Sequence, residues 1–398
     1  MKLSLCMIVK DEEAVLPQCL QSVKDVVDEM VVLDTGSTDR TPEIAAELGA
    51  KVYQFEWCHD FSAARNEALK YVQGEWILVL DADEVLNLEI VPQLQQAIAL
   101  NNHLVINLVR QEVGASQSPY SLVSRLFRHH PEVRFSRPYH AMVDDSVAQL
   151  LQKEPQWQIG YLPEVAILHY GYQPGAIAAR DKFAKAQAAM EGFLATHPTD
   201  PYVCSKLGAL YVQTGQLAKG IELLERGLLE AQPQTDASVL YELHYHLGNA
   251  YTRLPKLKPA AEHYQAAIQQ PILTKLKLGA YNNLGNLLMA VGDLTNAKTA
   301  YETTLQIEPS FAVGSYNLGM TLKAMGRFDQ AIAAYQNAIE LNPDYAEAYQ
   351  NLGVTWLKMG NVLESLAAFR KAIALHQSQN PTEAERLRQG LQEMGFQV

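Results

Sequence analysis

Three aspartates follow two short apolar segments, in positions where a nucleotide ligand can be bound. Asp34 comes directly after the segment 29–33, and Asp81 and Asp83 follow the segment 75–80. Two carboxylates spaced i, i+2 at a strand end can direct one side chain toward a ribose and the other toward a hard divalent cation. Such a cation stabilises the charge of a departing diphosphate. The pattern predicts transfer chemistry on a nucleotide substrate.

Each aspartate also has a purely structural interpretation. Asp34 and Ser37 can cap the helix that begins near Thr41. Asp81 and Asp83 can form a solvated acidic turn. The apolar segment directly before Asp81 favours ligand binding over a solvated turn, because it places the pair at the end of a buried strand.

The elements that position these aspartates alternate between strand and helix. Segments rich in β-branched residues are separated by stretches of helical period: strands at 3–9, 29–33, 51–55 and 75–80, helices at 12–24, 41–48 and 61–72. This alternation predicts a parallel sheet covered by helices, with its ligand crevice at the carboxyl ends of the strands. Further strands are expected at 104–109 and 122–127, and residues 128–165 are expected to be rich in loops.

The second half of the chain contains an internal repeat. A spacing of 34 residues recurs in two sets of glycines and one set of aromatic residues: Gly285, Gly319 and Gly353; Gly292, Gly326 and Gly360; Tyr301, Tyr335 and Phe369. Two less regular copies lie near Leu207 and Leu247. Each copy reads as a pair of amphipathic helices with a glycine turn, which resembles the tetratricopeptide repeat (TPR). A helix from Thr382 to about Met394 is expected to cap the stack.

Charge and cysteine content limit the functional class. The chain has 32 Lys and Arg against 44 Asp and Glu, a net charge of -12, and residues 1–175 carry 13 basic and 24 acidic side chains, or -11. This excludes a general nucleic-acid binder, and a phosphate ligand needs local cations or a metal ion. The four cysteines form no CxxC pair, which is typical of a reducing compartment. No apolar segment reaches the roughly 18 to 20 residues of a membrane span, and the first residues lack signal-peptide features, so a cytoplasmic location is expected.

The order of motifs in the first half resembles the opening of a family 2 glycosyltransferase with the GT-A fold. The matching segments are CMIVKDEE, VVLDTGSTDRT, EIAAELGAKVYQFEW, DFSAARNEALK and GEWILVLDADE. The resemblance implies an α/β GT-A (Rossmann-like) nucleotide-sugar domain followed by an all-α TPR solenoid. The expected boundaries are 1–178 for the glycosyltransferase domain, 179–198 for a linker helix, 199–380 for about five TPRs and 381–398 for a capping helix.

The resemblance also implies contacts to the nucleotide-sugar donor. Asp34 matches the aspartate that contacts the base, and Lys10 and Asp11 lie in the loop against it, with Lys10 where many relatives have an aromatic residue. Arg65 matches an arginine near the donor, where a guanidinium suits phosphate oxygens; a surface ion pair is the alternative. Asp81 matches the first aspartate of the DxD motif.

The implied metal site contains Asp83, the second aspartate of the DxD motif, and His169. His169 lies in the segment HYGY, from which related enzymes often supply a histidine ligand, although a single histidine on a strand is also a common core residue. The ion expected is Mn²⁺ or Mg²⁺. The donor expected first is a UDP-sugar.

The general base is the least defined part of the predicted site. An inverting transfer needs a carboxylate that takes the acceptor proton, and relatives often read HE where residues 139–141 read YHA. Asp144 is the candidate that replaces the missing acid, with Asp145 and Glu164 as alternatives. A basic cluster nearby can contact a diphosphate or an acidic acceptor, or simply balance acids: Arg125, Arg128, Arg134 and Arg137.

These observations predict a metal-dependent inverting hexosyltransferase. It would move a hexose or N-acetylhexosamine to a protein or glycan acceptor, and its TPRs would bind the acceptor or protein partners. A non-catalytic TPR scaffold with a degenerate sugar-nucleotide domain is the alternative, motivated by Ala141 and Lys10. A nucleotidyltransferase is disfavoured because the loop after the first strand is neither glycine-rich nor basic.

Overall fold

The computed structural model describes residues 2–115, 119–137, 141–171, 176–233 and 235–396. The chain divides into two compact units, 1–235 and 236–398. The first unit therefore contains the predicted catalytic domain together with the first helices of the repeat region. The predicted domain boundaries at 178 and 198 stay a prediction.

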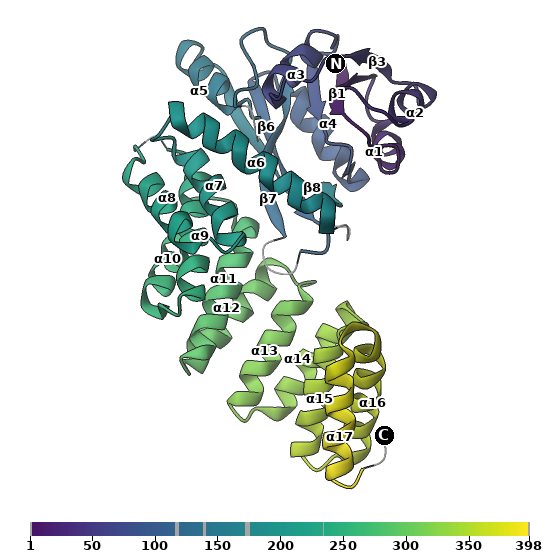
Figure 1. Ribbon diagram of the computed structural model, residues 1–398, viewed down its shortest axis with the longest axis vertical. Helices are drawn as coiled ribbons and strands as arrows, with labels where there is room; N and C mark the ends of the chain where they lie inside the picture. Colours follow the sequence, from purple (N-terminus) through teal and green to yellow (C-terminus); the bar gives the residue numbers. More distant parts are fainter. Residues whose placement is uncertain (1, 116–118, 138–140, 172–175, 234, 397–398) are drawn as a thin grey trace. The chain divides into compact units, whose positions relative to one another are not determined.

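The first unit is built on an eight-stranded sheet with the order β3-β2-β1-β4-β7-β6-β8-β5 (Figure 1). Its strands are β1 (Leu3–Val9), β2 (Glu29–Asp34), β3 (Lys51–Gln54), β4 (Trp76–Val79), β5 (Glu84–Leu86), β6 (His103–Glu112), β7 (Tyr120–Arg128) and β8 (Gln158–His169). The first four strands are parallel, as predicted. The sheet is mixed, because β7 runs antiparallel to β4 and β6, and β5 antiparallel to β8.

Helices cover both faces of this sheet. They are α1 (Leu16–Val23), α2 (Thr41–Glu47), α3 (Phe61–Leu69), η1 (Leu88–Ile90), α4 (Val91–Ala99) and α5 (Asp144–Lys153), followed by α6 (Ala176–Thr196), α7 (Pro201–Gln213) and α8 (Leu217–Leu229). The side chains of α1 and α4 belong to one buried apolar cluster, and those of α3 and α5 belong to another. Residues 128–165 are not mainly loop: they contain α5 and the first part of β8.

The second unit consists of helix pairs. Its helices are α9 (Ala237–Arg253), α10 (Leu257–Gln269), η2 (Thr274–Lys277), α11 (Leu278–Ala290), α12 (Leu294–Ile307), α13 (Ala312–Ala324), α14 (Phe328–Leu341), α15 (Ala346–Lys358), α16 (Val362–Gln379) and α17 (Pro381–Glu393). The repeating glycines sit where the helices of a pair meet. A Cβ added to Gly285 would lie 2.7 Å from Cε1 of Tyr301, so only glycine lets the buried ring approach the helix this closely.

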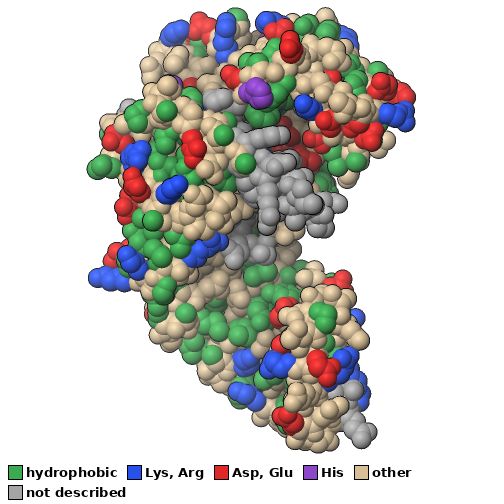
Figure 2. Space-filling model, viewed as in Figure 1, with side chains coloured by type: hydrophobic (Ala, Val, Ile, Leu, Met, Phe, Trp, Pro, Cys, Tyr) green, Lys and Arg blue, Asp and Glu red, His purple; other side chains and the backbone are tan. Residues whose placement is uncertain are grey.

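Within the described ranges, no helix has both the length and the apolar character needed to cross a bilayer. Figure 2 shows acidic side chains gathered over the part of the first unit that carries α1 and α2. The acidic character predicted for the first half is thus visible on its surface.

Candidate active site

The carboxyl ends of β1, β2 and β4 lie at one edge of the sheet. β1 pairs in parallel with both neighbours, and Val9 at its end is opposite Asp34 at the end of β2. Asp81 and Asp83 follow β4 directly. The strand order reverses at β1, and open α/β sheets bind ligands at such a reversal. The fold therefore brings the three predicted aspartates to the expected edge.

Asp34 closes the turn after β2. Its carboxylate is 1% exposed and accepts hydrogen bonds from the backbone N–H groups of Gly36 and Ser37, all at 3.2 Å. Gly36 has a φ of 96°, a conformation that glycine adopts at little cost. These contacts stabilise the turn itself; the helix cap considered above as the alternative is not observed, because the N-cap of α2 is Arg40 and it makes no side-chain cap hydrogen bond. The contact with a nucleotide base stays a prediction.

Asp11 joins the two loops that follow β1 and β2. Its backbone N–H donates to Oγ of Ser37 at 2.9 Å, and its Oδ1 accepts from the backbone N–H of Thr38 at 2.7 Å. Its φ of 54° is unusual for a residue other than glycine. Lys10, next to it, is exposed. Both residues therefore lie beside the Asp34 turn, and Asp11 helps to fix that turn.

Two arginines hold the carboxylate of Asp81. Arg65 on α3 donates from Nη2 to Oδ1 at 2.6 Å, and Arg125 on β7 donates from Nη2 to Oδ2 at 2.7 Å. Burial alone would raise the pKa of Asp81, but the two guanidinium groups outweigh it and hold this pKa far below its usual range. Asp81 is thus ionised, and two positive charges converge on it.

Arg65 has a nitrogen left over. The residue is only 7% exposed, and its buried Nη1 has no hydrogen-bond partner in the described part of the chain. A buried N–H group without a partner is costly. Arg65 is therefore oriented by Asp81 while one of its buried nitrogens stays without a partner among the described residues, and its role near the donor stays a prediction.

A β-bulge brings Arg125 to this site. Ile106 pairs with Leu126 and Leu108 pairs with Val123, so Asn107 of β6 faces two residues of β7, Ser124 and Arg125. Bulges near functional sites redirect a side chain in this way. The sequence showed Arg125 only as one member of a basic cluster, because the pairing register that gives it Asp81 as a partner is not visible in the sequence.

Asp83 and His169 lie together, as expected. Nε2 of His169 lies 3.2 Å from Oδ2 of Asp83, and Nδ1 lies 2.5 Å from Oε2 of Glu112 at the end of β6. Burial would lower the pKa of His169, but the hydrogen bonds to Asp83 and Glu112 raise it to about 10. The backbone of Gly171 passes so close that an added Cβ would lie 2.6 Å from Nε2 of His169.

Further charged residues, which the sequence motifs did not reveal, connect Asp81 with the pair Asp83 and His169. Glu84 is fully buried and accepts from the backbone N–H of Asp81 at 2.9 Å. Arg110 on β6 contacts Glu84 at 3.0 Å and Glu112 at 2.8 Å. In the sequence, only the position of Glu84 directly after the DxD motif could have indicated these contacts. Arg110 and Glu112 lie on β6, which carries no recognisable motif.

A divalent ion fits this site only in part. The 3.2 Å between Nε2 of His169 and Oδ2 of Asp83 is close to the spacing of two ligands that are each about 2.1 Å from one ion. Within the described residues, however, no three His, Cys, Asp or Glu side chains are arranged as a metal site. Asp83 and His169 would hold the ion as a pair, and donor phosphates would complete its shell, as is usual for Mg²⁺.

Asp144, the predicted general base, lies in the first turn of α5. Its Oδ1 accepts from Oγ of Ser124 at 2.8 Å, and the same hydroxyl contacts Oδ1 of Asn107 at 2.9 Å. Ser124 directly precedes Arg125, which contacts Asp81. The β-bulge therefore places Asp144 near the Asp81 cluster, which consists of Asp81, Arg65 and Arg125. The alternative Asp145 is instead bound by Arg137 through two contacts of 3.1 and 3.2 Å.

Other candidates lie elsewhere. Glu164 is exposed on β8. Arg128 donates to backbone carbonyls and lies over the rings of Trp76 and Trp157, so it packs against the core. Three residues of the segments YHA and HYGY fall outside the described residues: Tyr139, His140 and Tyr172.

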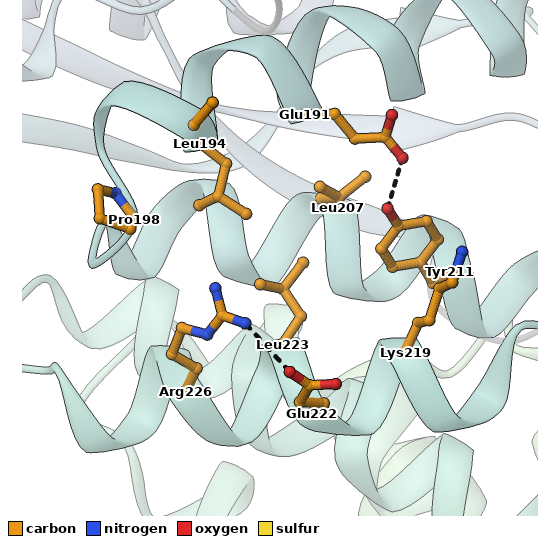
Figure 3. A pocket seen from close by; sticks show the side chains of 10 residues that line it. Glu191, Leu194, Pro198, Leu207, Tyr211, Lys219, Glu222, Leu223 and Arg226 are labelled. Atoms are coloured by element: carbon orange, nitrogen blue, oxygen red, sulfur yellow. Dashed lines mark hydrogen bonds and ion pairs between the residues drawn. The ribbon is translucent and has the colours of Figure 1, made fainter.

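The repeat helices also carry cavities. One of about 450 Å³ lies among α6, α7 and α8, where three leucines form the apolar part (Figure 3). At its rim, Tyr211 donates to Glu191 at 2.6 Å and Arg226 contacts Glu222 at 3.2 Å. A second cavity of about 400 Å³ occupies the equivalent place among α12, α13 and α14. The recurrence indicates that repeat geometry forms these cavities, and both lie outside the Asp81 cluster.

Comparison with known proteins is consistent with both parts of this description. The family model of glycosyl transferase family 2 matches residues 4–160, and four models of tetratricopeptide repeats match segments between residues 178 and 378. A TPR repeat-containing protein of Synechococcus elongatus is 47% identical over 308 residues, which are 77% of this chain and 76% of that protein.

More distant relatives match less of the chain. The SPbeta prophage-derived glycosyltransferase SunS of Bacillus subtilis is 28% identical over 49% of this chain and 45% of its own length. One similar solved structure is that of YrrB, a TPR protein with an unusual peptide-binding site. The match has 18% sequence identity and a TM-score of 0.43, and it covers 52% of this chain and 100% of the YrrB chain. The chain thus carries a glycosyltransferase family 2 domain at residues 4–160 followed by tetratricopeptide repeats, and the 47% identical relative shows that it belongs with the TPR repeat-containing proteins.

Proposed function

We propose that this glycosyltransferase moves a hexose or N-acetylhexosamine from a nucleoside diphosphate sugar, in the first instance a UDP-sugar, to an acceptor hydroxyl. The observation that carries the proposal is the position of Asp81 between Arg65 and Arg125. Next to it lies the pair Asp83 and His169. One sheet edge thus offers cations for a diphosphate and carboxylates for a ribose and a metal ion.

The donor would lie along this edge. Arg65 would contribute positive charge beside a donor phosphate, and Asp34, Lys10 and Asp11 are the predicted contacts on the base side. Asp83 and His169 would hold Mn²⁺ or Mg²⁺, which supplies positive charge that offsets the charge of the diphosphate. Arg65 and Arg125 supply fixed positive charge at the same edge, oriented in advance by Asp81.

The proposed reaction is a single displacement. The acceptor oxygen forms a bond to the anomeric carbon while the bond from that carbon to the diphosphate oxygen breaks on the opposite face. The nucleoside diphosphate leaves with that electron pair, and the acceptor proton passes to Asp144. Ser124 holds the Asp144 carboxylate at the start of α5, which supports its assignment as the base. The configuration at the anomeric carbon is inverted.

The TPR helices would bind a protein or glycan acceptor, or protein partners of the enzyme. Stacked helix pairs form extended surfaces that suit such binding. The two cavities in equivalent places supply apolar floors with charged rims. A cytoplasmic location remains the expectation from the sequence.

Donor and metal binding can be tested together by thermal unfolding. UDP or GDP at 1 mM would be added with and without Mn²⁺ to the wild type, to Asp83→Ala, and to the control Asp25→Ala in the exposed turn after α1. A nucleotide that binds at about 10 µM stabilises the folded state by about 2.7 kcal/mol. We expect a Mn²⁺-dependent shift with one nucleotide, kept in the control and lost in Asp83→Ala. No shift with either nucleotide would contradict the proposal and favour the scaffold alternative.

Stereochemistry tests the mechanism. Slow hydrolysis of α-linked UDP-glucose or UDP-N-acetylglucosamine uses water in place of the acceptor, and early NMR spectra show which anomer is released. The β anomer is expected. Release of the α anomer would exclude a single displacement.

A further inference from the structure

Arg137 contacts both α5, which packs on the sheet, and α7 of the first unit. It lies between β7 and α5, its side chain is 8% exposed, and its φ is 77°. An arginine in the left-handed region is uncommon and is kept only where the surroundings fix it. Here Ser62 at the start of α3 donates a hydrogen bond to its carbonyl oxygen.

On one side Arg137 binds the start of α5. Its Nη2 lies 3.1 Å from Oδ1 of Asp145 and its Nε lies 3.2 Å from Oδ2, a two-point contact that fixes both groups. The hydroxyl of Ser136 donates to the same carboxylate. Asp144, the predicted base, is the adjacent residue in this first helical turn.

On the other side Arg137 binds the start of α7, the first helix of the repeat region. Its Nη1 donates to Oδ1 of Asp200 at 3.0 Å, and its guanidinium carbon lies 4.5 Å from the centre of the Tyr202 ring. Oδ1 of Asp200 also accepts from the backbone N–H of Val203 at 2.9 Å and so caps α7. One guanidinium therefore joins the first turns of two helices.

We propose that Arg137 is a positioning residue for the transfer reaction: it fixes the start of α5, and with it Asp144, against the start of α7. The first repeat helix is then part of the catalytic apparatus. The idea rests on the proposed function, because it takes Asp144 as the base. Ser124 on β7 holds Asp144, and Arg137, which is bound to Asp200 at the start of α7, holds the neighbouring Asp145.

The physical reason is the sensitivity of proton transfer to position. A displacement of about 1 Å at a catalytic group can cost about 100-fold in rate. Removing the charge of Asp200 leaves the hydrogen bonds of Arg65 and Arg125 to Asp81 in place, so donor binding should not change. The expected signature is a lower kcat at constant KM for the donor.

The test variant is Asp200→Asn. It keeps a side-chain oxygen to cap α7 but removes the charge that Arg137 contacts. Asp236→Asn is the matched control, because Asp236 caps α9 through the N–H of Ser238 and belongs to the second unit. A second pair separates the ring contact from the hydroxyl: Tyr202→Leu removes the ring, and Tyr202→Phe keeps it.

Two readouts are measured in the full-length protein: kcat and KM for hydrolysis of the UDP-sugar that wild type accepts, and hydrogen–deuterium exchange of residues 141–150. We expect Asp200→Asn to lower kcat about tenfold at unchanged KM, with Asp236→Asn near wild type. In exchange, Asp200→Asn and Tyr202→Leu should be faster than wild type, and Tyr202→Phe and Asp236→Asn should resemble it. Equal kcat and exchange in Asp200→Asn and Asp236→Asn would overturn the proposal. If wild type hydrolyses no donor, the proposed function fails, and unchanged exchange in Asp200→Asn would separately overturn the positioning of α5 by α7.

Discussion

Arg125 and Asp81 form a two-point contact, with Nη2 at 2.7 Å from Oδ2 and Nη1 at 3.4 Å from Oδ1. Because Arg65 binds the same carboxylate, two positive charges meet one negative charge at Asp81. Over the whole site the charges balance: Arg65, Arg110, Arg125 and protonated His169 face Asp81, Asp83, Glu84 and Glu112. The positive charge that a diphosphate needs is therefore confined to the guanidinium groups beside Asp81, within a half of the chain whose side chains sum to -11.

Arg125→Met should reduce both stability and nucleotide binding. Methionine keeps much of the volume but leaves Asp81 with Arg65 alone. Removing one partner of a buried pair costs about 3 to 5 kcal/mol, and since the Asp81 side chain is 36% exposed, a smaller loss of about 1 to 2 kcal/mol is expected here. Urea denaturation measures the loss. Arg134→Met, at an exposed position, is the control, and an equal loss in both variants would refute the role of the Asp81 contact.

Gly171→Ala should weaken metal binding specifically. Its Cβ would lie 2.6 Å from Nε2 of His169 and 3.2 Å from Oδ2 of Asp83, so one of these side chains must move. The Mn²⁺-dependent part of the nucleotide-induced shift in Tm should shrink or disappear. Gly390→Ala is the matched control, since no atom lies within 4 Å of its added Cβ. A full Mn²⁺ effect in Gly171→Ala would argue against a metal at Asp83 and His169.

The parts of the fold that follow from local patterns were predictable. The 34-residue spacing identified the helix pairs, and the apolar segments identified β1, β2 and β4, which are buried on both faces. β3 was also identified, although it is only partly buried. β8 was missed because Gly160, Pro163 and Glu164 interrupt its apolar pattern. The antiparallel insertion of β7 beside β4 depends on pairing between residues about 50 apart, which no local pattern encodes.

The candidate site also contains residues whose positions were predictable from the sequence and residues whose positions were not. Asp34, Asp81 and Asp83 were predictable because each directly follows a strand, and a strand end has a fixed place in such a sheet. Arg125 and Glu112 could not be assigned, since their partners Asp81 and His169 lie 44 and 57 residues away. Tertiary register determines those contacts, and in the case of Arg125 a bulge does so.

Acid should destabilise the α9–α10 pair through His244. Its Nδ1 lies 3.0 Å from Nδ1 of His263, and burial, followed by the charge of His263, lowers the pKa of His244 to about 4. In the unfolded chain the pKa of His244 is about 6.5. Between about pH 6.5 and pH 4 the unfolded chain therefore binds a proton at His244 that the folded protein does not bind. The free energy of unfolding is highest above about pH 6.5 and falls as the pH drops. A loss of about 2 kcal/mol is expected from pH 7 to pH 5.

The measurement is the pH dependence of the unfolding midpoint in urea. His244→Asn should show a shallower fall between pH 7 and pH 5 than wild type, whatever its stability at pH 7. The exposed His59→Asn should retain the wild-type slope. Identical slopes in all three proteins would show that folding does not lower the pKa of His244.

Gly285→Ala should destabilise the repeat unit through a steric conflict with Tyr301. The added Cβ would lie 2.7 Å from Cε1 and 2.8 Å from Cζ of this ring, which is fully buried and donates from its hydroxyl to Asn286 at 2.7 Å. The ring is held at its far end by that hydrogen bond and cannot move freely, so the helices must separate. Overpacking of this kind costs about 1 to 3 kcal/mol, more than alanine gains in helix propensity, which is about 1 kcal/mol.

Urea denaturation followed by helical circular dichroism should show the loss. Gly390→Ala should instead be neutral or stabilising, and a stabilised Gly285→Ala would show that the ring can yield at no cost.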